Sequence, residues 1–192
     1  MDERAFNQAR QILNAGGVVV FPTDTVYGIG ARPDQPAAIR RIQEIKRRDA
    51  GKPIALLVSD AEAPARFGAE LPPAAQRLAK RFWPGALTLV LPVRGGYEGF
   101  RVPNHPLAAE IIRAGGGLLR VTSANRSGEP PALTPAEAFQ SVGRQADLMI
   151  NGGDVPGVMA STVVKVRADN STEILREGAI PRREIEAALK DE

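Results

Sequence analysis

The sequence predicts an α/β fold in which helices pack against a mixed β-sheet. Apolar residues at helical spacing alternate along the chain with short apolar runs of strand length. Several strand-like runs also follow one another with no helix between them, which argues against a purely parallel, doubly wound sheet. No repeat and no linker is found, so we expect a single domain spanning residues 1–192.

A helix, a strand and a loop are expected at the start of the chain. Apolar residues fall at helical spacing over 6–13, and Gly16-Gly17 ends that helix. Residues 18–21 form a short, continuous apolar run that predicts a buried strand, which Pro22 ends. We expect residues 23–30 to form a loop.

A second helix is expected after this loop. Asp34 is its expected N-terminal cap, and Pro36 suits its first turn. Its buried stripe consists of isoleucines at helical spacing, namely Ile39, Ile42 and Ile45. The basic triplet 46–48 therefore lies at the C-terminal end of this helix.

The rest of the chain continues with short strands and helices. Thr134 and Glu137 have the spacing of a capping box, and residues 63–74 are the most loop-like interior segment. The other expected elements are strands at 54–59, 87–93, 99–102, 118–121, 147–150, 160–166 and 173–175, a turn at Gly95-Gly96, and helices at 72–83, 107–113, 135–142 and 181–189.

The composition excludes several kinds of chemistry. With no cysteine the chain has no disulfide, no thiolate nucleophile and no thiolate zinc site, and its one histidine, His105, excludes a site that needs two. No protein-held metal is expected. The apolar runs are too short to cross a bilayer and the N-terminus opens with acidic residues, so we expect a cytoplasmic protein with no membrane contact.

Basic charge is concentrated in one segment. The chain has a net charge of only +3, whereas seven basic and three acidic residues lie between Arg32 and Lys52. The triplet Lys46-Arg47-Arg48 has two interpretations. It is either a solvated helix end whose cations complement the helix dipole, or a phosphate clamp in which Lys46 and Arg48 flank a cleft. Lys52 is either a third member of the clamp or a surface lysine.

Hydroxyl and amide side chains follow two of the expected strands. Thr23 and Thr25 come after the first strand, and Ser123 and Asn125 come after the strand at 118–121. Ligands of α/β proteins bind at such strand ends, but the same residue types also form turns through local hydrogen bonds. The sequence leaves both interpretations open.

Three further residues have chemistry of their own. Arg101 suits either a ligand carboxylate or a structural salt bridge. His105, next to a proline, fits a turn or helix cap better than a catalytic base. Arg176 adds positive charge at another strand boundary. The two familiar nucleotide motifs, the dinucleotide fingerprint and the P-loop, are absent, so any nucleotide site is built from cations and loops.

Eight ordered stretches between about residue 15 and residue 180 resemble the YrdC-like family, the threonylcarbamoyl-AMP synthases. These stretches are 22–30, 46–48, 52–53, 83–90, 101–106, 122–128, 161–164 and 176–179. The resemblance implies a twisted mixed sheet with flanking helices that enclose a basic cavity, in the short, single-domain form of the family.

The resemblance also implies an activity. Such a synthase makes L-threonylcarbamoyladenylate and pyrophosphate from L-threonine, bicarbonate or carbon dioxide, and ATP. Mg²⁺ would be bound mainly through the ATP phosphates. The product would pass to a downstream threonylcarbamoyl transferase complex that modifies adenosine 37 of tRNA, with possible direct contact to tRNA or other RNA.

The family motifs assign roles to residues of this chain. ATP-binding residues would be Lys46, Arg48, Ser123, Asn125 and Arg176, of which Lys46 and Arg48 would be catalytic. Threonine-binding residues would be Thr23, Thr25, Arg101 and Ser161. The chain departs from the family pattern at Asp49, Leu56-Leu57 and Lys165, and the departures concern the threonine contacts more than the nucleotide site.

A second hypothesis belongs to another class of protein. A non-catalytic RNA-binding protein of the same fold, acting in ribosome or tRNA maturation, could use the basic surface between Arg32 and Lys52. Only nine aromatic residues are available for base stacking and no RNA-binding motif occurs, so we rank this hypothesis second.

Overall fold

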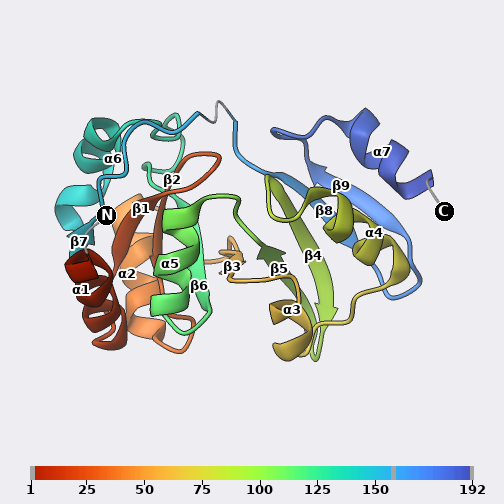
Figure 1. Cartoon of the computed structure of the whole chain (residues 1–192), viewed down its shortest axis with the longest axis horizontal. Coiled ribbons are helices and arrows are strands. Elements are labelled where there is room, and N and C mark those ends of the chain that lie inside the picture. Colours follow the sequence, from red (N-terminus) through yellow and green to blue (C-terminus); the bar gives the residue numbers. More distant parts are fainter. Residues whose placement is uncertain (1–2, 157–158, 191–192) are drawn as a thin grey trace.

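The computed structural model describes residues 3–156 and 159–190. Its strands are β1 (Val19–Pro22), β2 (Tyr27–Ala31), β3 (Leu56–Val58), β4 (Leu87–Val93), β5 (Gly96–Arg101), β6 (Leu118–Ser123), β7 (Leu148–Met149), β8 (Thr162–Val166) and β9 (Thr172–Arg176). They form one sheet in the order β7-β1-β2-β6-β3-β5-β4-β8-β9, which runs through the molecule from side to side (Figure 1). Parallel pairs (β1–β7, β3–β5 and β4–β8) occur among antiparallel ones, so the predicted mixed sheet is confirmed.

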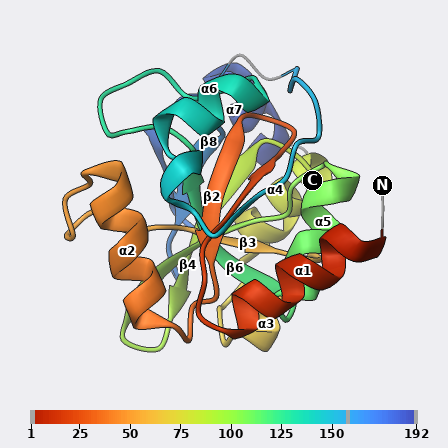
Figure 2. The same cartoon turned by 90° about the vertical axis from the view of Figure 1, so that its left-hand side faces the viewer.

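Helices cover the two halves of this sheet differently. The helices are α1 (Glu3–Asn14), α2 (Pro36–Lys46), α3 (Ala63–Arg66), α4 (Pro73–Phe82), α5 (Pro106–Ala114), α6 (Pro135–Ser141), the 3₁₀ turn η1 (Gly143–Gln145) and α7 (Arg182–Lys190). Around β1, β2 and β6, α2 lies on one side of the sheet and α1 and α5 on the other (Figure 2). In the other half, α3, α4 and α7 pack on one face of β4, β5 and β8.

Strand alternation explains why the first half has two hydrophobic layers. Successive side chains of a strand point to opposite faces. Val20 therefore packs toward α2 and α6, whereas Val19 and Phe21 pack toward α1 and α5. A strand buried on both faces appears in sequence as a continuous apolar run, which is why residues 18–21 were predictable.

The expected loop at 23–30 is wrong in its second half, where β2 is a fully buried strand. Gly28 and Gly30 obscured it, because glycine is unfavourable in strands. The tertiary structure requires them: a Cβ at Gly28 would lie 2.7 Å from Val121 Cγ1, and one at Gly30 would lie 2.8 Å from Val121 Cγ2. Two neighbouring strands can pair at this point only because β2 has no side chain there.

The start of α2 also differs from the prediction. Asp34 does not cap the helix, because its carboxylate accepts hydrogen bonds from Arg32 at 2.8 and 3.1 Å. Gln35 occupies the cap position without a side-chain hydrogen bond, and of the three stripe residues Ile39 is only half-buried. The other expected elements are found, with ends shifted by up to three residues, and a short helix, α3, lies in the segment expected to be loop-like.

The capping box before α6 is confirmed. Thr134 Oγ1 accepts a hydrogen bond from the Glu137 amide at 3.2 Å, and the Glu137 carboxylate accepts one from the Thr134 amide at 3.1 Å. We expect Thr134→Ala to lower the free energy of unfolding by about 1 kcal/mol, a shift of roughly 2–4 °C in melting temperature, whereas Thr134→Ser retains the bond. Differential scanning calorimetry checks this, and equal melting temperatures for the two variants would contradict it.

No helix within residues 3–156 and 159–190 is long and apolar enough to cross a membrane.

Candidate active site

A cavity of about 330 Å³ lies between the two halves of the sheet. This volume is within the range of small-molecule sites. Its walls come from the β1–β2 turn and β6 on one side and from β4, β5, β8 and β9 on the other, with the segment before β3 between them. Residues distant in sequence therefore meet in one concave surface.

Side chains that alternate between the two faces of β4 and β8 form one wall of the cavity. Leu89 and Val164 face the core under α4 and α7, whereas the alternate residues Thr88, Val90 and Val163 face the cavity. The helices of this half cover one face of the sheet, so the opposite face is available to a ligand.

The threonines of the β1–β2 turn both stabilise the turn and line the cavity. Thr23 Oγ1 bonds the Val26 carbonyl at 2.7 Å and accepts hydrogen bonds from the amides of Thr25 and Val26, so Thr23 forms the turn. Its hydroxyl also lies 3.0 Å from that of Thr25, and both residues line the cavity. The turn fixes two buried hydroxyl groups at the wall.

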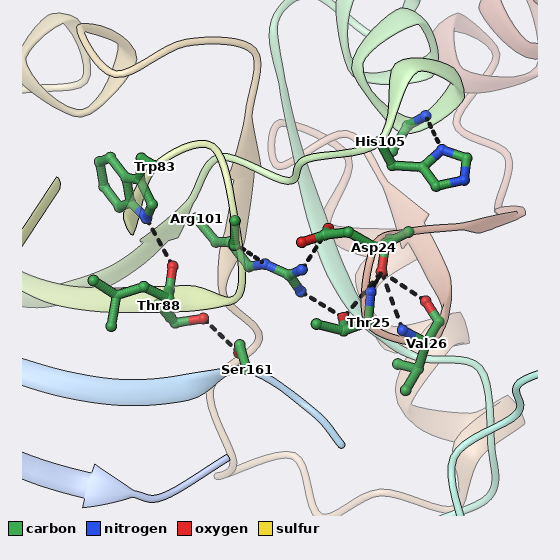
Figure 3. A network of polar contacts seen from close by, with 12 residues as sticks. Asp24, Thr25, Val26, Trp83, Thr88, Arg101, His105 and Ser161 are labelled. Carbon is green, nitrogen blue, oxygen red and sulfur yellow. Dashed lines mark hydrogen bonds and ion pairs between the residues drawn. The ribbon is translucent and has the colours of Figure 1, made fainter. Parts of the chain in front are cut away.

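Arg101 links the two halves of the molecule at this wall (Figure 3). Its guanidinium donates hydrogen bonds to Asp24 Oδ1 at 2.6 Å, to Thr25 Oγ1 at 2.8 Å and to the Gly85 carbonyl at 2.9 Å. Burial lowers the pKa of Arg101, and Asp24 opposes that effect. Both interpretations of Arg101 therefore hold. It forms a buried salt bridge with Asp24, and although it is only 5% exposed it also lines the cavity.

Ser161 connects the neighbouring strands. Its hydroxyl lies 2.8 Å from Thr88 Oγ1, and its carbonyl accepts a hydrogen bond of 2.7 Å from Arg176 Nη2. All three residues line the cavity.

Two arginines of the cavity differ from Arg101 in their partners. Within the described parts of the chain, neither Arg48 nor Arg176 is paired with a carboxylate. Arg48 donates to the Pro53 carbonyl at 3.0 Å, and its Nε is buried without a hydrogen-bond partner. Partial burial and the Arg48 guanidinium lower the pKa of Arg176. Two cations in electrostatic contact and without counter-ions favour an anionic ligand.

Lys46 is not in the position that the clamp hypothesis requires. It is the last residue of α2, it is 1% exposed, and it does not line the cavity. Its ammonium donates hydrogen bonds to the carbonyls of Ser123 and, at 2.5 Å, Asn125. Its own carbonyl accepts one from the Ser127 amide at 2.8 Å. Lys46 therefore holds the loop after β6 from behind the cavity wall.

Burial lowers the pKa of Lys46 to about 8, with a further lowering from Arg48 and an opposing effect of Glu129. The left-handed backbone of Arg47 (φ 50°) ends α2 and lets the next residue, Arg48, turn toward the cavity. The two cations of the Lys-x-Arg pair therefore have different contacts: Arg48 lines the cavity, whereas Lys46 bonds the loop that carries Ser123.

Asn125 is not among the residues that line the cavity either. Its Nδ2 donates to the carbonyls of Arg126 and Glu129 at 2.9 and 2.7 Å, and its buried Oδ1 has no hydrogen-bond partner within the described residues. Ser123, two residues earlier, lines the cavity. Asn125 shapes the loop that presents Ser123.

The structure thus brings most of the predicted site residues together. The predicted residues that line the cavity are Thr23, Thr25, Arg48, Arg101, Ser123, Ser161 and Arg176, and those behind its wall are Lys46 and Asn125. The sequence interpretation missed Asp24, which sits between two residues that it named, and Glu98, which lines the cavity and pairs with Arg120 at 2.5 Å. The sequence gives no local indication of these two carboxylates, because their arginine partners, Arg101 and Arg120, are distant along the chain.

Other sequence predictions near the site are settled by contacts. His105 is the N-cap of α5, where its Nδ1 accepts a hydrogen bond from the Ala108 amide at 3.4 Å, as predicted. Lys52 is exposed and does not line the cavity. Lys165, one of the departures from the family pattern, places its ammonium 4.0 Å from the ring centroid of Tyr97, which lines the cavity.

The fold and this site define an α/β protein with a small-ligand cavity whose uncompensated cations suit an anionic ligand. A profile of the Sua5–YciO–YrdC family, described as telomere recombination, matches residues 11–178. The chain belongs to this family.

Relatives and solved structures agree with that membership. The chain is 38% identical to the threonylcarbamoyl-AMP synthase of Bacillus subtilis over 194 aligned residues, which cover 95% of the chain and 56% of that protein. It is also 38% identical to that of Stenotrophomonas maltophilia, with 79% and 88% covered. The crystal structure of P. abyssi Sua5 complexed with L-threonine superposes with a TM-score of 0.92 at 32% identity, covering 99% of this chain and 58% of that one.

The chain therefore spans between half and two thirds of the length of the B. subtilis and P. abyssi proteins. The match confirms the predicted family and its twisted mixed sheet.

Proposed function

We propose that the chain forms L-threonylcarbamoyladenylate and pyrophosphate from L-threonine, bicarbonate or carbon dioxide, and ATP. One observation carries the proposal: the cavity holds arginines of two kinds. Within the described residues Arg48 and Arg176 have no carboxylate partner, whereas Arg101 is paired with Asp24 and donates to the Thr25 hydroxyl. The unpaired arginines suit a triphosphate, and the neighbouring, compensated Arg101 suits an amino acid, which carries charges of both signs.

The reaction needs no nucleophile from the protein. The threonine amine attacks carbon dioxide to form a carbamate, and a carbamate oxygen then attacks the α-phosphorus of ATP while pyrophosphate leaves. Positioning the two substrates and stabilising the departing phosphates are the tasks of the site. Arg48 and Arg176 would take the phosphates, and Ser123 would contact the nucleotide between them and the amino-acid end.

The amino acid would lie on the side of Arg101. Two N–H groups of its guanidinium are not used by the three contacts within the protein, so they remain for a carboxylate. The Thr25 hydroxyl contacts Arg101 directly and would orient the substrate, and the Ser161 hydroxyl, beside Thr88 and Arg176 in the same cavity, would contact it from the other wall. The partly enclosed cavity would also limit loss of carbon dioxide from the carbamate.

Carboxylates are scarce around the cavity in the described parts of the chain. Within the described residues no group of three acidic, histidine or cysteine side chains lies together, and Glu98 is already paired with Arg120. We propose that Mg²⁺ is held mainly by the ATP phosphates, where it would neutralise their charge.

Release of pyrophosphate tests the proposed function. We expect release only when L-threonine, bicarbonate and ATP are all present, and a product whose mass rises by one unit with ¹³C-bicarbonate, since the carbamoyl carbon comes from it. Mass spectrometry identifies the product, and omission of each substrate in turn is the control. Pyrophosphate release that does not depend on threonine would contradict the proposal.

The RNA-binding hypothesis has less support from the structure. Two of the arginines in the basic segment are neutralised, Arg32 by Asp34 at 2.8 Å and Arg41 by Asp147 at 2.6 Å. Salt-sensitive binding of unmodified tRNA without ATP turnover would favour that hypothesis instead. Transfer of the product to tRNA by a downstream transferase complex, and a cytoplasmic location, stay predictions of the sequence.

A further inference from the structure

The side chain of Arg101 is fixed by several contacts within the protein. Its guanidinium makes three hydrogen bonds to groups from two different loops, the β1–β2 turn and the segment before β4. The shortest of them, 2.6 Å, goes to Asp24, and the two side chains are only 7% and 15% exposed. A buried guanidinium without such a partner would be strongly unfavourable.

Asp24 contacts a residue of the cavity wall without lining the cavity itself. It does not line the cavity, although its neighbours Thr23 and Thr25 do. In the close view its carboxylate lies between Arg101 and His105 of the α5 cap (Figure 3). The contact of Asp24 with the site therefore runs through the guanidinium.

The position of Asp24 is fixed in advance by its turn. The Thr23 hydroxyl bonds three backbone groups of residues 25 and 26, so the turn that carries Asp24 has little freedom. The carboxylate therefore determines both the orientation of the Arg101 fork and its charge balance.

We propose that Asp24 is a positioning residue for amino-acid recognition: it holds Arg101 so that two free N–H groups face the substrate carboxylate, and it neutralises Arg101 so that phosphate is not drawn to this end. This inference rests on the proposed function, because it takes the amino acid to bind at Arg101. Arg48 and Arg176, for which the described residues supply no carboxylate partner, keep their charge for the triphosphate.

The test compares Asp24→Asn with native protein. We expect the KM for threonine to rise about 10- to 100-fold, and that for ATP to change less than about twofold, because a charge-assisted bond is lost only at the amino-acid end. Pyrophosphate should also become a better competitor of threonine in the variant. The matched control is Asp60→Asn, which removes a carboxylate 2.7 Å from Arg66 away from the cavity and should leave both constants unchanged.

A double-variant cycle shows whether Asp24 acts through Arg101. In an Arg101→Lys background, Asp24→Asn should have little further effect on threonine, since the fork that it positions is gone. If Asp24→Asn does not fold, Asp24→Glu keeps the charge but displaces it, and it should also raise the KM for threonine. An unchanged KM for threonine in a folded Asp24 variant would overturn the inference.

Calorimetric titration with threonine separates this inference from the proposed function. Native protein that binds threonine but releases no pyrophosphate would refute the proposed reaction alone. In that case the affinity of the variants for threonine still decides the role of Asp24: equal affinity in native protein and Asp24→Asn would refute the inference, and so would an absence of threonine binding to native protein.

Discussion

We expect Lys46→Met to lower threonine-dependent pyrophosphate release about 100-fold or more. Methionine has a similar length but no charge, so the carbonyls of Ser123 and Asn125 would lose their buried donor. Removing one partner of a buried, charged hydrogen bond costs about 2–5 kcal/mol, and the loop that presents Ser123 would relax. The effect arises although Lys46 does not line the cavity.

Hydrogen exchange distinguishes an anchor from a phosphate ligand. In Lys46→Met the amides of residues 123–128 should exchange faster, whereas Arg48→Met should lower activity without changing their exchange. Lys52→Met, the same replacement at an exposed lysine of the following loop, is the matched control and should behave as native protein. Unchanged exchange in Lys46→Met would show that Lys46 does not hold the loop.

The pKa of Lys46 gives this prediction a pH dependence. Its value of about 8 in the folded protein lies below its ordinary value of 10.5, so the folded protein binds the proton less tightly than the unfolded chain does. The free energy of unfolding therefore rises between pH 8 and 10.5, by up to about 3 kcal/mol from this group. The difference between native protein and Lys46→Met, measured by urea unfolding across this range, should show the rise, and a constant difference would contradict it.

We expect Arg48→Met combined with Arg176→Met to lower the affinity for ATP about 1,000-fold, since each charged hydrogen bond to a phosphate contributes about 1.5–3 kcal/mol. The variant loses the hydrogen bonds of these side chains to the carbonyls of Pro53 and Ser161, so thermal unfolding first checks that it is folded. The two guanidiniums repel each other, and within the described residues neither has a carboxylate partner whose loss would cost stability.

Titration calorimetry with ATP at two salt concentrations checks this, because the salt dependence of binding should weaken with the two charges removed. Arg94→Met, at an exposed arginine of the β4–β5 turn, is the control and should leave affinity unchanged. A double variant that binds ATP normally would place the triphosphate elsewhere.

Local patterns made much of the fold predictable. The isoleucines of α2, the apolar run of β1 and the capping box at Thr134 each depend on residues a few positions apart, so the sequence contains the whole signal. Strand β2 was missed because its glycines are required by close contact with Val121 on β6, which lies almost a hundred residues later in the chain. A requirement of that kind cannot be found from local propensity.

The candidate site was also predictable only in part. Position at a strand end made Thr25 and Arg101 candidates, because the rule that ligands bind there depends only on the order of elements, but it left their structural interpretations open. The family resemblance assigned these two residues and Ser161 to the ligand. The direction of a side chain was not predictable. Lys46 and Arg48 belong to one short motif, yet the left-handed Arg47 sends one behind the wall and the other into the cavity.

The sequence by itself determined the alternation of helices and strands, the absence of thiol chemistry and the family, since these follow from composition and from motifs within short stretches. Only the tertiary structure decided which cations are free and which are engaged. Whether a cation is available to a ligand depends on its counter-ions and carbonyl partners, and the carbonyl partners of Lys46 and the Asp24 counter-ion of Arg101 lie 77 to 79 residues away along the chain.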